Sequence, residues 1–444
     1  MKNSPPPVMR SKPPIVISLL LKPALPLTFA PMYNIAPAAI SVSRVNDRKP
    51  AAASRTRIES IDLLRGTVMI IMALDHVRAY FHRDVSLFDP TDLSKTTPLL
   101  FFTRWITHFC APVFVFLAGV SAYLHGARKG RKALAFFLLT RGVWLLFAEL
   151  FIVGLAWYFN PLFPYFNLQV IWAIGCSMIA LAALIYFPFQ LILLTGVLII
   201  AGHNLLDNVH VPGNSLAAIG WGLLHDGGNF HLGNKQVFIH YPILPWIGIM
   251  TVGFCAGYLY RSSMRMGNRR SILICLGAGA ITLFIVLRAL NVYGESHPWS
   301  VQRNFAFSLA SFLNTTKYPP SLLYILMTLG PAMVFLALSE RVRTTWTSKI
   351  QVFGRVPMFY YLAHLYLVHL LAVLGAAISI HNWKAMFFLA SSPARVTALK
   401  GYGFDLLVVY LVWIAVVLLL YPLCKRFDSY KRAHVATQWW LTYL

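Results

Sequence analysis

One short stretch of the sequence carries an unusual set of ionisable side chains in an apolar surrounding. The run SIDLLRGTVMIIMALDHVRAYFH (60–82) contains Asp62, Arg65, Asp75, His76 and Arg78. Charged groups at membrane depth are costly, so they indicate a functional site by default. Since histidine titrates near neutral pH, His76 is the candidate general base of this set, with Asp75 as the partner that would orient it.

The spacing of these residues predicts how one helix presents them. Asp62 and Arg65 are three residues apart and are helical neighbours. Arg65 and His76 are eleven residues apart, about three turns or ~16 Å of rise, so they share one face. Adjacent residues point about 100° apart, so Asp75 faces a different direction from His76. The alternative interpretation is an interfacial ion pair and a histidine at a helix end.

Further polar residues interrupt other apolar stretches, and most lie toward the same predicted side of the membrane. Arg104 and His108, four residues apart, share a helix face. Several such groups converging at one depth predict a cavity at mid-depth or open to that side. For each residue alone, a structural hydrogen bond is an equal alternative. The predicted substrate-binding residues are Arg78, Arg104, His108, Glu149, Lys317 and His364.

Composition indicates what surrounds these residues. The 444-residue chain is 58% hydrophobic and 12% charged, with a mean hydropathy of +0.64, which favours lipid over water as its solvent. Its net charge of +24 would suggest nucleic acid in a soluble protein. Here the basic residues cluster between apolar runs, which the positive-inside rule explains better, so we expect no nucleic-acid partner.

The apolar runs predict an all-α, polytopic membrane bundle of about ten transmembrane helices. Four basic segments, 125–133, 261–270, 340–350 and the tail, then fall on one side, which predicts cytoplasmic N- and C-termini. We expect a disordered Pro-rich tail over 1–56, the membrane domain over 57–427 and a cytoplasmic tail over 428–444. The predicted spans are 61–81, 99–124, 134–158, 168–187, 189–206, 239–260, 271–291, 321–339, 353–376 and 404–424.

Other chemistries have weaker support. The five cysteines show no metal-like spacing, and the histidines between 203 and 240 are irregularly spaced, so no metal site is expected. The sequence has no P-loop, no dinucleotide-binding glycine motif and no GxSxG motif.

Long motifs resemble a known family. RIESIDLLRGTVMIIMALDHVRAYF (57–81) and FFTRWITHFCAPVFVFLAG (101–119) are similar to the bacterial membrane family related to heparan-α-glucosaminide N-acetyltransferase. The resemblance runs from about residue 57 to 425. Further matching motifs are QVIWAIG (169–175), YPILPWIG (241–248), FLNTTKYPPSLLYILMTLGP (312–331) and GRVPMFYYLAHLYLVH (354–369).

The resemblance implies an acetyltransferase that uses cytosolic acetyl-CoA. Arg65 and His76 match the basic residue and the later histidine of a wider superfamily of membrane acyltransferases that O-acylate cell-surface sugars. The related lysosomal enzyme has Asn at the position of His76, and its catalytic histidine matches a position near Leu87, where the nearest histidine here is His82. We therefore assign the base to His76, while His364 matches a late-helix histidine of that family.

Two functions follow as hypotheses. The first is transfer of an acyl group, expected to be acetyl, from acyl-CoA to a sugar or glycoconjugate amine or hydroxyl, with Arg65 and Asp62 on the CoA side. The alternative is a transporter of a sugar or lipid intermediate, for which broken helices and mid-depth polar groups are equally suitable. A bacterial inner membrane is the expected location. The acceptor, the acyl group and the oligomeric state are not encoded in these motifs.

Overall fold

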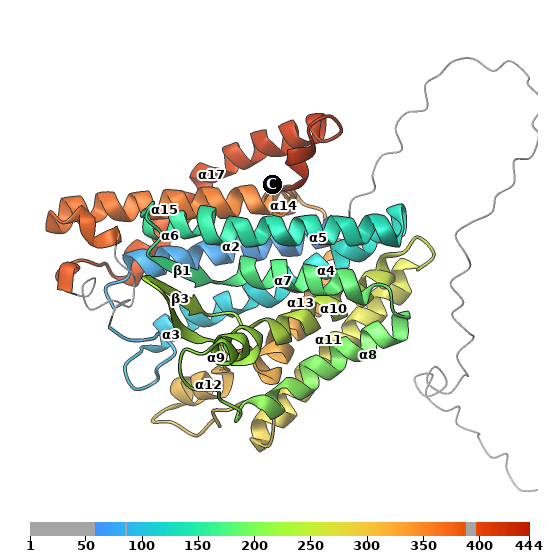
Figure 1. Cartoon of the computed structure of the whole chain (residues 1–444), viewed down its shortest axis with the longest axis horizontal. Coiled ribbons are helices and arrows are strands. Elements are labelled where there is room, and N and C mark those ends of the chain that lie inside the picture. The colour runs from blue at the N-terminus through green and yellow to red at the C-terminus, as the bar shows by residue number, and fades with distance from the viewer. Residues whose placement is uncertain (1–57, 85–86, 388–396) are drawn as a thin grey trace, which may run out of the picture. The chain divides into compact units, whose positions relative to one another are not determined.

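The computed structural model describes residues 58–444 except 85–86 and 388–396, so the predicted tail over 1–56 lies outside the described residues. The described part belongs to one unit, in which long helices run side by side between two ends (Figure 1). Its helices are α2 (Glu59–Phe81), α3 (Pro98–Trp105), α4 (Cys110–Lys129), α5 (Arg131–Phe147), α6 (Gly154–Tyr158), α7 (Val170–Leu184), α8 (Phe189–Gly202), α9 (Leu216–Trp221), α10 (Ile243–Ala256), α11 (Met266–Leu290), α12 (Phe305–Leu313), α13 (Leu322–Ser339), α14 (Thr345–Arg355), α15 (Pro357–Ile380) and α17 (Leu406–His434).

Eight helical segments of the described chain are long and apolar enough to cross a membrane, and the chain is an integral membrane protein. They coincide with eight of the predicted spans. The two other predicted spans are also helices: α2, which carries five charged residues, and α7, which has 15 residues. α7 is short because the chain before it is extended up to Leu168. α17 continues to His434, beyond the predicted domain boundary at 427.

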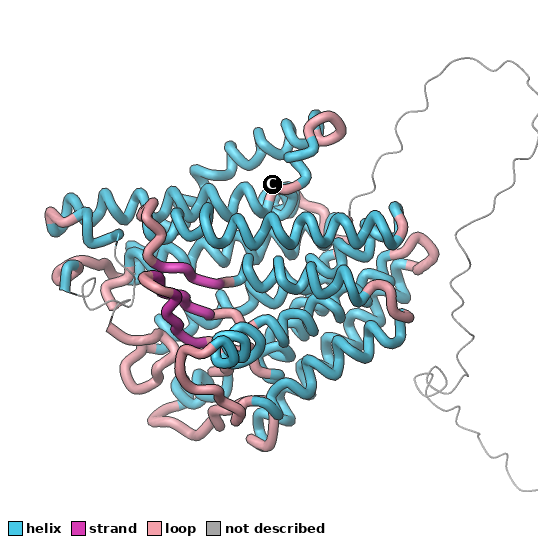
Figure 2. Tube along the Cα trace, in the orientation of Figure 1, coloured by secondary structure: helices cyan, strands magenta, loops and turns pink. Residues whose placement is uncertain are grey.

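A small sheet departs from the all-α prediction. Its three strands are β1 (Tyr165–Leu168), β2 (Gly228–Leu232) and β3 (Lys235–Ile239), in the order β1-β3-β2 (Figure 2). β1 pairs parallel with β3, and β2 pairs antiparallel with it. Gly233 has a φ of 59° in the tight turn between β2 and β3, a conformation that favours glycine. Apolar residues alternate here, and Phe230 faces Val237 in a buried cluster, so short loops fold as strands rather than staying irregular.

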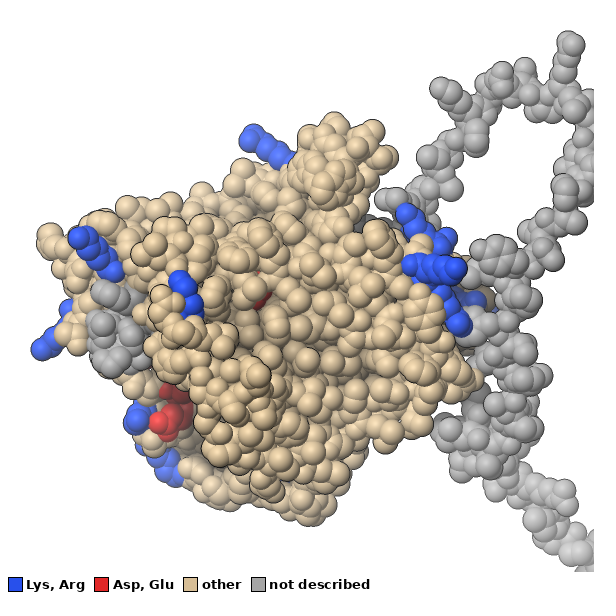
Figure 3. All heavy atoms as spheres, viewed as in Figure 1, with Lys and Arg blue, Asp and Glu red and all other residues tan. Residues whose placement is uncertain are grey.

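The helices form an inner and an outer set. Among the 18 consecutive residues that make up the most apolar part of α13, 67% are buried. In the corresponding part of α17, only 17% are buried. The outer helices therefore expose leucine, isoleucine and valine side chains, as lipid-facing helices do. Figure 3 shows a broad, almost uncharged band across the middle of the face it views, with Lys and Arg gathered mostly toward its edges.

Two of the basic segments, 261–270 and 340–350, meet at the end of the bundle where α2 begins, because Arg269 pairs with Glu340. We call this end the basic end. Arg343 pairs with Glu59 at the start of α2, at 3.0 Å. Arg355 of α14 pairs with Asp428 of α17, at 2.8 Å. The sheet lies at the opposite end of the bundle, which we call the sheet end (Figures 1 and 2).

Two glycines allow α2 to pack directly against α14. A Cβ added at Gly354 would overlap the main-chain oxygen of Asp62, and one at Gly66 would overlap that of Ile350. Small residues let helix backbones approach this closely in membrane proteins. Arg65 secures the contact by donating to the Gly354 carbonyl oxygen, at 3.2 Å. The polar face of α2 is thereby fixed toward the interior.

Candidate functional site

A cavity of about 210 Å³ lies toward the sheet end, and we call it the sheet-end cavity. α2 contributes Asp75 and His76 to its wall, and the loop before α13 contributes Lys317 and Tyr318. These polar groups share the cavity with aromatic and apolar side chains, as is usual for small-molecule sites. The remaining lining residues are Met72, Ala79, Thr107, Cys110, Ala111, Phe114, Trp157, Gln169, Val170, His240, Tyr241 and Tyr361.

His76 and His364 form a hydrogen-bonded pair at this wall. The His76 Nδ1 lies 2.7 Å from the His364 Nε2, and the two rings are almost parallel, with 4° between their planes. Trp157 packs edge-on against the His76 ring, with centroids 5.2 Å apart. Two helices far apart in sequence, α2 and α15, thus hold one imidazole in a defined orientation.

The hydrogen bonds of this pair assign its protons. The His364 Nδ1 lies 2.7 Å from the Tyr360 carbonyl oxygen, which can only accept, so this nitrogen carries the hydrogen. The Nε2 of a neutral His364 is then an acceptor, and the His76 Nδ1 donates to it. The His76 Nε2 is left with a free lone pair. That arrangement is the one a general base requires.

Asp75 is engaged by arginines. Its Oδ1 accepts from Arg78 at 2.9 Å, and its Oδ2 accepts from Arg104 at 2.5 Å. The orienting contact predicted for Asp75 is made instead by His364, because neighbouring residues on a helix point in different directions. Two cations on one carboxylate, together with Lys317, leave this wall of the cavity positively charged.

Lys317 and Tyr318 line the cavity from a loop rather than from a helix. The Lys317 ammonium lies 5.2 Å from the centre of the Tyr318 ring. Removal of the phenol from bulk water raises the pKa of Tyr318, but Lys317 and Arg104 outweigh this effect, so the pKa lies below its ordinary value. Tyr318 also packs edge-on against Tyr241, at 5.2 Å. The loop thus adds a cation and a strong hydrogen-bond donor to the cavity.

A second cavity, of about 330 Å³, lies toward the basic end, and we call it the basic-end cavity. Four side chains line both cavities and form a shared wall between them: Met72, Phe114, Val170 and Tyr361. The two cavities therefore follow one another through the bundle. The basic residues that line the basic-end cavity are Arg65, Arg141, Arg355 and Lys431.

These basic residues differ in how far they are already paired. Arg65 donates to Ser121 at 3.0 Å and lies 3.5 Å from Asp62, so Asp62 holds Arg65 and does not line the cavity itself. Lys431 bonds the carbonyl oxygen of Leu444. Arg141 packs on aromatic rings, and its buried Nε has no hydrogen-bond partner among the described residues.

Several predicted substrate-binding residues lie behind the wall. Arg78 and Arg104 are buried against Asp75. The buried His108 ring packs against Tyr324, at 5.5 Å. Glu149 is 1% exposed and accepts from the Gln169 N–H, at 3.0 Å, just before α7. These groups shape the site from behind, as His364 does.

His82, the histidine closest in sequence to the position expected from the lysosomal enzyme, lies outside both cavities. It directly follows the last residue of α2, and its Nδ1 accepts from the main-chain N–H of Asp84, at 3.2 Å.

Other lining residues were not singled out from the sequence. Tyr361 lies three residues before His364, and Tyr318 follows Lys317. Arg141 lies in an apolar stretch with no polar neighbour at helical spacing. The sequence did contain a signal for Tyr318 and Tyr361, because both lie in motifs that resemble those of the family. The motifs at 169–175, 241–248, 312–331 and 354–369 each contribute residues to a cavity wall.

Within the described residues, no group of three or more His, Cys, Asp or Glu side chains is placed to hold a metal ion. The family model described as heparan-alpha-glucosaminide N-acetyltransferase, catalytic, matches residues 57–293, more than half of the chain. The resemblance expected up to residue 425 extends beyond that match. No curated protein matches the chain. On the family match, the chain belongs to the heparan-α-glucosaminide N-acetyltransferase family of membrane acetyltransferases.

Proposed function

We propose that this protein transfers an acetyl group from acetyl-CoA to the amine or hydroxyl of a sugar or glycoconjugate, with His76 as general base. The observation that carries this proposal is the free lone pair of the His76 Nε2 in a cavity wall, set by the contact with His364. The family to which the chain belongs supports the acetyl donor.

The reaction needs one proton to move. The acceptor nitrogen or oxygen attacks the thioester carbon as the His76 Nε2 takes its proton. The new bond to the acetyl carbon forms, the carbon–sulfur bond breaks, and the CoA thiolate leaves and recovers the proton from the imidazolium. General base catalysis of this kind contributes typically ~10²–10⁴-fold. His364 stabilises the imidazolium by accepting from its Nδ1.

The two cavities suit the two substrates. The basic-end cavity offers guanidinium and ammonium groups to the phosphates of CoA, and Arg141 has unused donor capacity there. The sheet-end cavity offers Lys317, Tyr318 and His240 to the hydroxyls or anionic groups of the acceptor. The thioester then reaches His76 across the shared wall.

We further propose that all ten predicted spans cross the membrane, with both termini in the cytoplasm. α2 has 23 residues, and its charged groups face partners inside the bundle. α7 has 15 residues, about 22 Å of helix against the ~30 Å of a hydrocarbon core, and the extended chain before it completes the crossing. The positive-inside rule puts the basic end on the cytoplasmic side. A bacterial inner membrane is the location proposed from the resemblance.

Radiolabelled acetyl-CoA tests the proposal. The purified protein in nanodiscs should bind acetyl-CoA saturably and release free thiol when an amino sugar or glycolipid acceptor is added. We expect His76→Ala to bind acetyl-CoA normally and to lose transfer. His225→Ala is a control, because His225 is a buried histidine that lines neither cavity. Full transfer by His76→Ala would remove His76 from the mechanism, and no thioester cleavage with any acceptor would refute the function.

A further inference from the structure

The loop that carries Lys317 and Tyr318 contains no helix or strand between α12 and α13, and its isolated bridge joins Lys317 only to Pro320 of the same loop. Something else must hold these two side chains in the wall of the sheet-end cavity. We propose that Glu295 is a positioning residue for the acceptor, because it fixes both ends of the Lys317–Pro320 segment. This inference rests on the proposed function, since it assigns the acceptor to that cavity.

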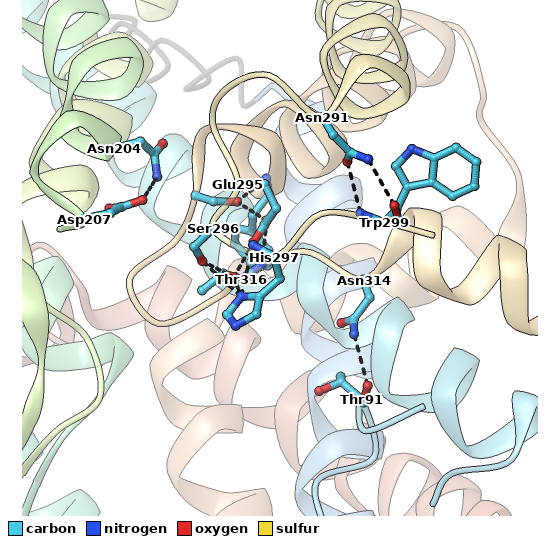
Figure 4. A network of polar contacts seen from close by, with 12 residues as sticks. Thr91, Asn204, Asp207, Asn291, Glu295, Ser296, His297, Trp299, Asn314 and Thr316 are labelled. Atoms are coloured by element: carbon cyan, nitrogen blue, oxygen red, sulfur yellow. Dashed lines mark hydrogen bonds and ion pairs between the residues drawn. The ribbon is translucent and has the colours of Figure 1, made fainter. Parts of the chain in front are cut away.

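The Glu295 carboxylate accepts hydrogen bonds from both sides of the segment. Its Oε2 accepts from the main-chain N–H of Thr316, at 2.8 Å, and from the Ser321 hydroxyl, also at 2.8 Å. Its Oε1 accepts from the Thr316 hydroxyl. Thr316 immediately precedes the segment, and Ser321 immediately follows it. Figure 4 shows Glu295 and Thr316 at the centre of this network.

The neighbouring loops hold Glu295 itself rigidly. Its side chain is 3% exposed. The buried Arg288 donates to the carbonyl oxygens of His297 and Asn314, both at 2.7 Å, and so joins the loop of Glu295 to the chain that leads into Thr316. Asn291 pairs with Trp299 across the base of the same loop (Figure 4). The carboxylate is therefore a fixed point rather than a mobile surface group.

A carboxylate suits this position because it only accepts hydrogen bonds. A glutamine of similar size has one acceptor oxygen and one donor group, so Glu295→Gln would place a donor against donors of the loop. The variant would release the Lys317–Pro320 segment with little change in volume. Glu340 is a matched control: its carboxylate is also 3% exposed and is paired with Arg269, but it lines neither cavity.

Steady-state kinetics with purified enzyme in nanodiscs distinguish positioning from a structural role. We expect Glu295→Gln to raise the acceptor KM about tenfold or more, with the acetyl-CoA KM unchanged and kcat within about threefold. Glu340→Gln should leave the acceptor KM unchanged. Should Glu295→Gln fail to fold, Thr316→Val removes one hydroxyl of the same network and should raise the acceptor KM by a smaller factor.

Hydrogen–deuterium exchange supplies a readout that needs no activity. Amides of residues 314–322 should exchange faster in Glu295→Gln than in wild type, and not in Glu340→Gln. Unchanged amide exchange in Glu295→Gln would show that Glu295 does not hold the Lys317–Pro320 segment. Faster exchange with an unchanged acceptor KM would show that holding the segment does not position the acceptor. A wild-type protein that transfers no acetyl group would instead refute the proposed function, and with it the acceptor role, while exchange still decides whether Glu295 holds the loop.

Discussion

Replacing His364 by phenylalanine removes the acceptor of the His76 Nδ1–H while a ring of similar size remains. His76 gains a positive charge as it takes the proton from the acceptor, so this hydrogen bond strengthens during the reaction. A hydrogen bond to a charged group contributes about 1.5–3 kcal/mol, and each 1.36 kcal/mol in a barrier is tenfold in rate. We therefore expect kcat to fall about 10- to 150-fold in His364→Phe, with the KM of both substrates little changed.

The assay is release of free CoA thiol at saturating acetyl-CoA and acceptor, per folded molecule in nanodiscs. Thermal unfolding gives the folded fraction, because the variant also leaves the Tyr360 carbonyl oxygen without its ring donor. His364→Gln is the matched control, since its amide oxygen can accept from His76, and it should lose less activity than His364→Phe. Wild-type kcat in His364→Phe would refute the assignment of protons to this pair.

Three other changes test the rest of the site. Asp75→Asn leaves Arg104 buried without its counter-charge, and we expect a loss of about 3–5 kcal/mol in unfolding free energy; unchanged denaturant unfolding would contradict the buried ion pair. Arg141→Gln should weaken acetyl-CoA binding about tenfold in equilibrium titrations and leave the acceptor KM unaltered, whereas a shift in the acceptor KM alone would place CoA elsewhere. Gly354→Ala should lower the melting temperature by forcing two helices apart, while Gly267→Ala, with open space around it, should not; equal melting temperatures would argue against the close crossing.

The sequence predicted the helices better than their contacts. Runs of apolar residues need no partner to be recognised, so all ten predicted spans are helices in the structure. The sheet was missed because its strands have only four or five residues each and lie within loops. The sequence predicted that α2 is a helix with ionisable residues on it. Whether such a charged helix can cross the membrane depends on the partners of those residues, which composition does not reveal.

The candidate site was only partly predictable, for a geometric reason. His76 was chosen from its type and position, but its partner His364 is 288 residues away, and helix packing alone brings them together. Asp75 was expected to orient His76 and contacts Arg104 instead, because helical geometry turns the two side chains apart. The proton assignment depends on one carbonyl oxygen, that of Tyr360, which no sequence pattern marks.

The shared wall between the two cavities has a consequence for the membrane in which the protein lies. Cavities that follow one another through a bundle would leak protons and ions if water filled them continuously. Met72, Phe114, Val170 and Tyr361 instead form a mostly apolar wall between them. An ion that enters apolar surroundings of this kind loses its hydration without compensation. An acetyl thioester carries no charge on its reacting end, so the proposed transfer of a two-carbon unit past this wall is compatible with a membrane that stays electrically insulating.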